Sequence, residues 1–595
     1  MRVAIDGRSP VSIRACRGRL VRTSARGAIV KNIVILGAGT GGALSANLLS
    51  HRLDLREWTI TVIDRAKLHI YQPGLLFLPF GMYGYESQDD VVRPIASPLP
   101  RNVTLLNADI RLIDHAKREV RTDQGTVAYD FLISALGCRT APEEVEGMAD
   151  AMGTGVHTFY TLEGAVAMRE ALDRFEEGRL VIDICEMPIK CPVAPLEFAF
   201  LADYHFRRKG IRDRVEISLV TPYTGAFTKP NANRILSKVA DEKGIKVVPN
   251  FAISAVDAAK KVIRTFDGRT VDYDLLCAIP PNLGPAVIDD SGLGDGAGYA
   301  ITDPRTLKSR KAERIYLLGD NTNVATSKAG SVAHFEAETV VENLLREIEG
   351  KPPLQTFDGH ANCFVETGHD KAMLLDFNYD IEPLEGSFPL PYAGPFSLLE
   401  ESHLNHLGKL AFKWVYWNML LPGHLPNVPL LPAHMSFIGK DLNTAPQIRV
   451  ARAMHVKDVM SSDVITVRQG TSLPAAADLM VAKKVSGLPV IDAEERLVGI
   501  LTEADFLSAM NIDGGFMANV LETIVRKRRV RKGMGTIVDD IMTPAPITIR
   551  ANDTLEMAVR RMDKNKVKRL VVTGEDQRVH GIVSRADLVK IFAMK

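Results

Sequence analysis

Cysteine is scarce in this sequence, and it lacks both long apolar runs and net charge. Six cysteines in 595 residues cannot build a disulfide scaffold, so each thiol has to be considered singly. No apolar run reaches the roughly 18 residues that a membrane-spanning helix needs, which leaves a soluble protein or one that lies on a membrane surface. The formal net charge of +1 gives no electrostatic reason to expect nucleic acid as a partner. The length itself predicts several domains.

The first 30 residues are basic and almost free of acids. They contain seven arginines and one acid, Asp6, and no apolar stretch like that of a secretory signal. We expect a disordered basic extension over residues 1–30, or translation from a start codon further along. The composition also permits a targeting segment.

A glycine-rich turn follows the first strand that we predict after this extension. Residues 31–36 are typical of a buried parallel strand, and three glycines come soon after it. Gly37 permits a tight turn, Gly39 lets the backbone approach a pyrophosphate, and Gly42 lets the next helix, residues 43–49, pack on the strand. The helix N-terminus then presents free N–H groups to the phosphates. This order of elements predicts a dinucleotide site.

Later segments indicate FAD rather than NAD. A second strand, residues 58–63, ends at Asp64, whose carboxylate can accept hydrogen bonds from ribose hydroxyls. Residues 129–137 and 314–320 end in a small-residue turn and in Gly-Asp, and resemble the later signatures of the two-dinucleotide-binding-domain flavoproteins. That resemblance implies FAD, with the Gly-Asp acid bonded to its ribityl chain; the alternative is an acid that only caps a helix. The FAD contacts assigned to these segments are Gly137, Gly319 and Asp320.

A second glycine turn is missing from the middle of the chain. Residues 178–184 form a predicted strand where a nicotinamide-binding turn would begin, but prolines and bulky residues follow over 185–197. They block close approach of a pyrophosphate, so we do not expect NAD(P)H as the electron donor. Cys191 is a candidate redox thiol, because the dipole of the predicted helix 195–204 would lower its pKa. Glu197, near the start of that helix, can act as a general base.

The ordered motifs resemble one flavoprotein family. The glycine turn, Pro-x-Lys-Cys-Pro-x-Ala-Pro-x-Glu, Gly-Asp and a late Cys-Phe are similar to the sulfide:quinone oxidoreductases over roughly residues 31–440. The resemblance implies that Cys191 and Cys363 flank the flavin and form a disulfide or polysulfide bridge, with Glu197 as a proposed base. It also implies that Lys328 lies near the flavin and the quinone; the alternative is a surface lysine. Taken singly, each cysteine is equally compatible with a buried small hydrophobe.

The remaining cysteines have less definite roles. Some family members carry a third cysteine where this chain has Tyr160, so we do not expect a covalent cysteine–flavin link from that position. Cys185, close to Cys191 in sequence, can take the third-cysteine role or be inert packing. Cys138 is a spare thiol, and we interpret Cys16 and Cys277 as structural or incidental.

Two segments suit contact with a membrane and a quinone. Residues 403–422 hold an apolar stripe with helical spacing, two of the three tryptophans, and Lys409 and Lys413 beside it. An amphipathic helix of this kind is typical of an interfacial anchor and resembles the C-terminal membrane helices of the family; the alternative is an ordinary core or dimer helix. Residues 71–81 are apolar and turn-rich, resemble the family segment beside the flavin, and are expected to line part of the quinone channel.

The last part of the chain repeats itself. Met460, Thr466, Gly499 and Asp505 recur at one constant offset. Each half closes with Gly-x-x-[Ser/Thr]-x-x-Asp, and the duplication resembles a pair of cystathionine-β-synthase (CBS) domains, whose family ligands are adenosine nucleotides. The alternative for each acid is a helix-capping carboxylate without a ligand. The resemblance assigns the nucleotide to Thr466, Thr502, Asp505, Thr548, Ser584 and Asp587.

These observations predict an α/β protein. It has two Rossmann-like dinucleotide-binding-type domains, a C-terminal amphipathic membrane-contact segment and an α/β CBS pair. The expected regions are a basic extension (1–30), a discontinuous FAD-binding domain (31–160 and 271–345), a second Rossmann-like domain without an NAD loop (161–270), a redox-cysteine and membrane-contact region (346–445), and CBS domains at 455–515 and 535–595.

The expected activity is FAD-dependent oxidation of sulfide to sulfane sulfur or polysulfide, with electrons passed to a membrane quinone. The expected partners are sulfide, the quinone, an adenine nucleotide at the CBS pair, a peripheral membrane surface on the cytoplasmic face, and further copies of the chain. Neither a metal site nor nucleic-acid binding is expected. The alternatives are a type-two NADH:quinone oxidoreductase-like enzyme, which should have a glycine turn after residue 184, and a non-catalytic redox or nucleotide sensor.

Overall fold

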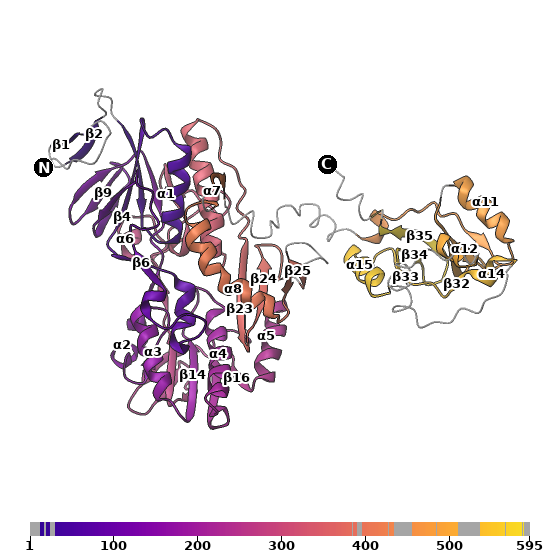
Figure 1. Ribbon diagram of the computed structural model, residues 1–595, viewed down its shortest axis with the longest axis horizontal. Coiled ribbons are helices and arrows are strands. Elements are labelled where there is room, and N and C mark those ends of the chain that lie inside the picture. The colour runs from indigo at the N-terminus through magenta and orange to yellow at the C-terminus, as the bar shows by residue number, and fades with distance from the viewer. Residues whose placement is uncertain are drawn as a thin grey trace. The chain divides into compact units, whose positions relative to one another are not determined.

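The computed structural model divides the chain into two compact units, Met1–Leu442 and Asn443–Lys595 (Figure 1). The residues that the structure describes are 12–16, 19–23, 30–383, 385–388, 395–425, 428–432, 455–483, 485–509, 536–565, 567–585 and 587.

A parallel five-stranded sheet carries the glycine turn. Its strand order is β22-β11-β3-β4-β7, so β3 lies at the centre of the sheet. The apolar residues of β3 and β11 are buried, as expected for a parallel sheet that is covered on both faces. Helices α1 and α7 lie side by side next to this sheet (Figure 1). The bounds are β3 (Lys31–Leu36), α1 (Thr40–Arg52), β4 (Trp58–Asp64), β7 (Thr104–Asn107), β11 (Phe131–Ser134), β22 (Ile315–Leu317) and α7 (Gly330–Ile348).

A second, mixed sheet includes part of the basic N-terminal segment. The strands β1 (Ser12–Cys16) and β2 (Arg19–Thr23) form an antiparallel pair, and β2 runs parallel to β10 (Gly125–Ala128). The prediction of disorder is therefore wrong for these two strands, because the edge of β10 offers backbone groups with which β2 can pair. The rest of residues 1–29 lies outside the described residues. The sheet continues through β9 (Glu119–Thr122) to β8 (Ile110–Asp114).

The segment without a second glycine turn also folds as a parallel sheet. Its strand order is β13-β20-β14-β15-β16, and helix α4 follows β14 through the loop that contains Cys191. The predicted α/β fold is confirmed. The bounds are β13 (Val156–His157), α3 (Leu162–Arg174), β14 (Gly178–Ile184), α4 (Ala194–Arg208), β15 (Val215–Val220), α5 (Pro230–Glu242), β16 (Ile245–Val248) and β20 (Leu275–Ile279).

A smaller sheet and a helix complete the N-terminal unit. The sheet has the order β23-β24-β26-β25, and helix α8 packs on β23 and β24 before it passes into the π-helix η7. Among the described helices, none has both the length and the apolar character needed to cross a membrane. The bounds are β23 (Ala361–Gly368), β24 (Lys371–Phe377), β25 (Gly386–Phe388), β26 (Phe396–Leu398), α8 (His403–Val415) and η7 (Tyr416–Leu420).

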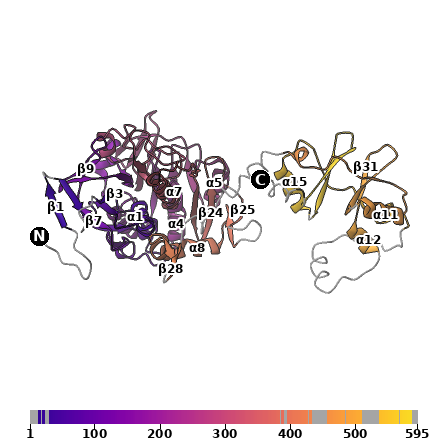
Figure 2. The same ribbon diagram turned by 90° about the horizontal axis from the view of Figure 1, so that it is seen from above.

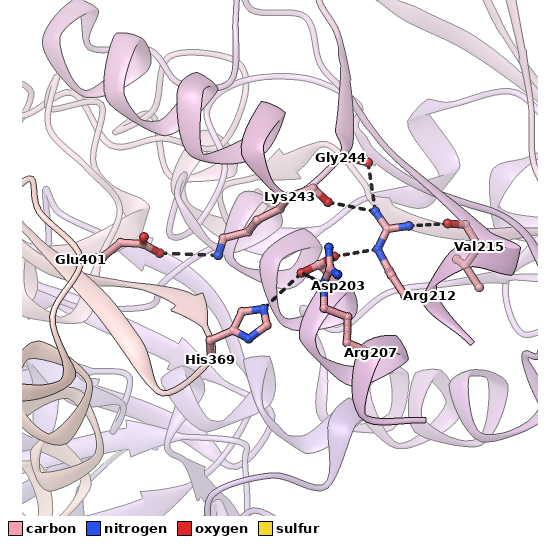
Figure 3. Close-up of polar contacts among 8 residues, drawn as sticks. All are labelled: Asp203, Arg207, Arg212, Val215, Lys243, Gly244, His369 and Glu401. Atoms are coloured by element: carbon pink, nitrogen blue, oxygen red, sulfur yellow. Dashed lines mark hydrogen bonds and ion pairs between the residues drawn. The ribbon is translucent and has the colours of Figure 1, made fainter. Parts of the chain in front are cut away.

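A buried carboxylate ties this sheet to the second Rossmann-like region (Figure 3). Asp203 on α4 accepts hydrogen bonds from Arg207 and Arg212, and His369, at the turn between β23 and β24, lies 3.4 Å from it. Arg212 also donates to the carbonyl oxygens of Lys243 and Gly244 at the end of α5. The cluster fixes β23, which carries Cys363, relative to α4, which carries Glu197.

The C-terminal unit contains two repeated modules that share strands. The first has the strand order β29-β30-β31-β32 and the second β33-β34-β35. Strand β32, at the start of the second repeat, pairs with β31 of the first, and Ser461 of the first repeat bridges Ile582 on β35. Figure 2 gives a second view of these elements, including β31, α11 and α12. The bounds are β29 (Val467–Arg468), α11 (Leu473–Lys483), β30 (Gly487–Ile491), β31 (Leu497–Thr502), α12 (Glu503–Ala509), β32 (Thr543–Pro544), β33 (Thr548–Ile549), α15 (Leu555–Lys564), β34 (Arg569–Thr573) and β35 (Val579–Ser584).

The repeated methionines and glycines meet across the two modules. A Cβ on Gly499 would collide with the side chain of Met542, and a Cβ on Gly581 would collide with that of Met460. Each repeat therefore supplies the methionine that covers the glycine of the other. This reciprocal contact is the physical reason why both residues recur at one offset.

Candidate active site

The glycine turn between β3 and α1 combines close packing with open space. Gly37 has a φ of +90°, and a Cβ on it would lie 2.5 Å from the Ala135 carbonyl oxygen. A Cβ on Gly42 would collide with the carbonyl oxygen of Gly37, whereas a Cβ on Gly39 would have no atom within 4 Å. Helix α1 has no side-chain cap at its N-terminus. Open space over Gly39 and free helix amides fit a pyrophosphate.

Asp64 holds the same turn from the neighbouring strand. One carboxylate oxygen accepts the Ala38 N–H at 2.6 Å, and the other accepts the Ala66 N–H at 2.7 Å. Each oxygen retains a second lone pair, which can accept a ribose hydroxyl. Asp64 thus shapes the turn in addition to the contact predicted from the sequence.

The two later signatures border the same region. Gly137 and Gly319 have φ of +70° and +76°, and a Cβ on either would have no atom within 4 Å. The Gly319 N–H donates to Glu336 on α7 at 2.5 Å, and burial raises the pKa of Glu336 to about 8. Burial also raises the pKa of Asp320, because removal from water disfavours the charged carboxylate, and Lys328 partly offsets this. These residues fit FAD, because they leave open backbone on three turns and place the half-buried Asp320 beside them.

Lys328 is buried, with only 8% of its surface exposed, which rules out the surface-lysine alternative. Its ammonium group donates to the carbonyl oxygens of Asp320 at 3.0 Å and Thr322 at 2.7 Å, and lies over the ring of Tyr299. Burial lowers the pKa of Lys328, partly offset by Asp320. The lysine therefore supports the segment that carries the proposed FAD acid.

Cys191 sits in a left-handed backbone conformation, with a φ of +47°. Such a conformation is unfavourable for a residue other than glycine and needs support from its surroundings. The Cys191 N–H donates to the Lys328 carbonyl oxygen at 2.6 Å, and the Cys191 carbonyl oxygen accepts from the Ala194 N–H at 2.9 Å. The Tyr160 hydroxyl donates to the same carbonyl oxygen at 3.2 Å. Three contacts thus hold the loop in place.

Cys363 on β23 is brought beside Cys191. Cys363 acts electrostatically on the Cys191 thiol, and Glu197 and Lys409 act on both thiols. Both cysteines are free thiols in this structure. The sequence placed Cys191, Cys363 and Glu197 in one site only through the family resemblance, and the fold brings all three together.

Burial dominates the chemistry of both thiols. It raises the pKa of Cys363 to about 11 and, together with Glu197, raises that of Cys191 well above its usual value. The prediction that the dipole of α4 lowers the Cys191 pKa is therefore wrong, because removal from water and a nearby carboxylate outweigh it. A reactive thiolate at this site needs a partner that stabilises its charge.

Glu197 forms a buried ion pair with Lys409. Only 2% of Glu197 is exposed, and its carboxylate also accepts the Glu366 N–H at 2.5 Å. Burial raises the pKa of Glu197, and Lys409 partly offsets this. Glu366 in turn pairs with the ring of His406 at 3.0 Å. The Glu197–Lys409 pair acts on both thiols, and Glu366 connects this pair to His406.

Each acid of the two C-terminal motifs accepts hydrogen bonds from the threonine or serine three residues before it. The Thr502 N–H and hydroxyl both lie 2.7 Å from an oxygen of Asp505, and Ser584 contacts Asp587 in the same way, at 3.0 and 2.6 Å. The capping alternative therefore describes these contacts.

The threonines of the C-terminal motifs lie apart from these caps. Thr548 lines a cavity of about 450 Å³ whose other lining residues do not include Ser584 or Asp587. Thr466 lies just before β29 and is partly buried. This cavity therefore includes only Thr548 of the second repeat's assigned residues.

Comparison with known proteins finds relatives among the sulfide:quinone oxidoreductases. A mitochondrial sulfide:quinone oxidoreductase of Dictyostelium discoideum is 29% identical over 405 residues, which cover 66% of this chain and 86% of that protein. The enzyme of the same name in Mus musculus is 25% identical over 401 residues, with the same coverage. The chain is a relative of the sulfide:quinone oxidoreductases. It is an oxidoreductase.

Two further comparisons extend this result. The solved sulfide:quinone oxidoreductase of the hyperthermophilic bacterium Aquifex aeolicus shares the fold, with a TM-score of 0.55 and 22% identity over 65% of this chain and 92% of that one. The family model of the CBS domain matches residues 456–512 and 538–593. The relative of the sulfide:quinone oxidoreductases therefore carries a CBS pair at its C-terminal end.

Two of the remaining thiols of this sulfide:quinone oxidoreductase relative, Cys185 and Cys138, contact other side chains. Cys185 packs in a different hydrophobic cluster from Cys191, and its thiol lies 3.2 Å from the Asp183 carboxylate. The third-cysteine role proposed for Cys185 is therefore not supported. The Cys138 sulfur lies 4.0 Å from the Asp320 carboxylate. Cys16 lies on β1, where the structure does not describe side chains.

Sequence reasoning missed the basic partner of Glu197. Lys409 was predicted to flank a membrane-facing stripe, but it points to the protein interior, on the far side of α8 from the exposed apolar residues. Helical spacing could have separated Lys409 from that stripe, but no sequence signal identifies Glu197 as its partner.

Helix α8 exposes an apolar face. Leu407 and Trp414 are 59% and 56% exposed, and Leu404 and Ala411 share their face. Trp417, in contrast, is buried under Arg93.

Proposed function

We propose that the chain is an FAD-dependent sulfide:quinone oxidoreductase, which oxidises sulfide to sulfane sulfur or polysulfide and passes the electrons to a membrane quinone. The observation that carries this proposal is the meeting of Cys191 and Cys363 beside the Glu197–Lys409 ion pair. Cys191 lies in the loop after β14, where a nicotinamide-binding flavoprotein would have its second glycine turn. The names of the relatives support the same substrates.

The proposed reaction begins with attack of hydrosulfide on a Cys191–Cys363 disulfide. The disulfide bond breaks, a new sulfur–sulfur bond forms on one cysteine, and the other cysteine leaves as a thiolate that holds the electron pair. Oxidation of HS⁻ to the level of elemental sulfur releases one proton and two electrons. Glu197 can hold that proton, because its pKa is raised by burial. Bound FAD supplies the two-electron chemistry between the thiol site and the quinone.

Helix α8 is the proposed contact with the membrane in which the quinone is dissolved. Its exposed apolar face, formed by Leu404, Leu407, Ala411 and Trp414, suits the boundary between lipid headgroups and acyl chains. We place the enzyme as a peripheral protein on the cytoplasmic face and as a homo-oligomer.

The CBS pair is the proposed regulatory part. An adenine nucleotide would bind at Asp505 or Asp587, once the carboxylate exchanges its capping contact for ribose hydroxyls. Calorimetry with AMP and ATP on the full chain tests this, with Asp505→Ala and Asp587→Ala as variants. Heat of binding that is lost in either variant is expected. No heat with any adenine nucleotide would contradict the regulatory proposal and leave the redox proposal intact.

Sulfide-dependent reduction of a soluble quinone tests the redox proposal. We expect Cys191→Ser and Cys363→Ser each to reduce turnover at least a hundredfold, because neither variant can form the bridge. Cys185→Ala is the matched control, since this buried thiol lies on the same loop but in another hydrophobic cluster. Equal activity of all three variants would contradict the proposed role of the bridge.

A further inference from the structure

The side chain of Ser331 contacts the sulfur of Cys363. It is the second residue of α7 and is buried, with 8% of its surface exposed. Its hydroxyl oxygen lies 3.8 Å from the Cys363 sulfur. Helix α7 packs on β23, so this contact is fixed by two elements of regular structure. No motif in the sequence singled out Ser331.

The direction of this hydrogen bond depends on the charge of the sulfur. With a neutral thiol, either group can donate; with a thiolate, only the Ser331 hydroxyl can, because the sulfur has lost its proton. Hydrogen bonds to a charged acceptor are stronger than those between neutral groups. The contact therefore favours the anionic form of Cys363 over its neutral form.

The other groups around Cys363 have opposing effects. Glu197 and Asp376 disfavour a thiolate there, and Lys409 favours it. Burial raises the pKa of Cys363 to about 11, and the Ser331 hydrogen bond is the largest influence in the opposite direction. Ser331 also lies at the N-terminal end of a 19-residue helix, where the helix dipole favours a negative charge.

Cys191 lacks an equivalent partner among the described residues. No side-chain hydroxyl in the described part of the chain donates to its sulfur. Burial and the carboxylate of Glu197 disfavour its thiolate, whereas Lys409 and the backbone N–H of Ala194 oppose them. The two thiols of the proposed bridge are therefore unlike. Cys363 has a side-chain hydroxyl at its sulfur, whereas the Cys191 sulfur has a backbone N–H, that of Ala194.

We propose that Ser331 is a catalytic residue, whose hydroxyl donates a hydrogen bond to the anionic sulfur of Cys363 when the cysteine bridge opens. This role rests on the proposed sulfide oxidation, although the hydrogen bond itself exists without sulfide. A lower thiolate pKa makes a better leaving group in thiol–disulfide exchange. Loss of the hydroxyl should therefore slow the opening of the bridge while leaving the fold and the cofactor site unchanged.

Alkylation of each thiol in the reduced holoenzyme tests the contact directly. Iodoacetamide is added at pH 8, and the modification of Cys363 and Cys191 is followed separately by peptide mass spectrometry. In Ser331→Ala we expect the Cys363 pKa to rise by about one unit. The tenfold smaller thiolate fraction is partly offset by higher nucleophilicity, so the alkylation rate should fall about threefold to fourfold. The rate at Cys191 should stay within a factor of about 1.5.

Two further variants separate the hydrogen bond from a general structural effect. Ser331→Thr keeps the hydroxyl and should restore most of the Cys363 rate. Ser327→Ala removes a hydroxyl from the preceding loop and should leave both rates unchanged. A wild-type Cys363 rate in Ser331→Ala, or an equal loss at both thiols, would overturn the proposal. Neither result depends on sulfide turnover, so failure of this proposal and failure of the proposed function can be told apart.

Discussion

The two strand–turn–helix units of the N-terminal unit differ in the turn that joins the strand to the helix. After β3, Gly37 and Gly42 pack so closely that no side chain fits, and Gly39 leaves open space where a pyrophosphate can lie. After β14, a bulky loop replaces the glycines and holds Cys191 in a left-handed conformation. The same unit of fold thus forms a phosphate cradle when its turn is small and open, and a rigid support for a thiol when its turn is filled.

The glycine turn should show the largest effects. Gly42→Ala places a methyl group against the Gly37 carbonyl, so we expect a loss of about 3 kcal/mol in the free energy of unfolding and loss of bound flavin. Gly39→Ala should keep the stability of the cofactor-free protein but lower its FAD affinity, since only open space surrounds that position. Denaturant unfolding and flavin content measure both effects. Equal stabilities of the two variants would contradict the account in which Gly42 is needed for packing and Gly39 for phosphate binding.

The thiol site should depend on the charge of Lys409. Lys409→Met leaves Glu197 buried without its partner, which should cost about 3 kcal/mol in the free energy of unfolding. The double variant Lys409→Met/Glu197→Gln should recover part of that loss, because no unpaired charge remains. Lys413→Met, one turn further along α8, is the control and should cost less than about 1 kcal/mol. A similar cost for both lysines would contradict the ion-pair account.

The loop that contains Cys191 follows a strand with a buried acid, Asp183 on β14. Strand β3 has no acid at the corresponding place. Burial raises the pKa of Asp183 at the end of β14 to about 7, while in the unfolded chain it titrates near 4. Between these values the folded protein keeps a proton that the unfolded chain releases, so stability falls as pH rises through this window. Relative to Asp183→Asn, the wild type should lose about 1.4 kcal/mol per pH unit there. Parallel stability–pH curves from denaturant unfolding would show that Asp183 does not titrate in this way.

The smallest effect is expected from the support of the Cys191 backbone. Tyr160→Phe removes one hydrogen bond to the Cys191 carbonyl oxygen, about 1 kcal/mol, and should lower the rate of sulfide oxidation several-fold. The KM for quinone should stay unchanged. Tyr223→Phe is the matched control, since its hydroxyl contacts Met187 on the same loop rather than Cys191. Equal losses in the two variants would indicate a general effect of removing a buried hydroxyl.

The sequence was informative where local chemistry dictates the backbone and less so where distant segments meet. The glycine turn and the duplicated C-terminal module follow from spacing, because tight turns and repeated packing need particular residues at fixed positions. The contacts of Lys409, Glu366 and Ser331 at the thiol site were not predicted, because their partners are distant in sequence. The prediction of a low pKa for Cys191 was wrong, because it considered the helix dipole but not the burial of the thiol.

The most direct test of the account is the identity of the reductant for bound FAD. The purified holoenzyme is mixed anaerobically with sulfide or with NADH, and the flavin absorbance is followed in the wild type and in Cys191→Ser. The account predicts rapid bleaching by sulfide in the wild type, little or none in Cys191→Ser, and no bleaching by NADH. Bleaching by NADH but not by sulfide would contradict it and favour an NADH:quinone oxidoreductase. If neither sulfide nor NADH bleaches the flavin, the account is contradicted and a non-catalytic sensor is favoured.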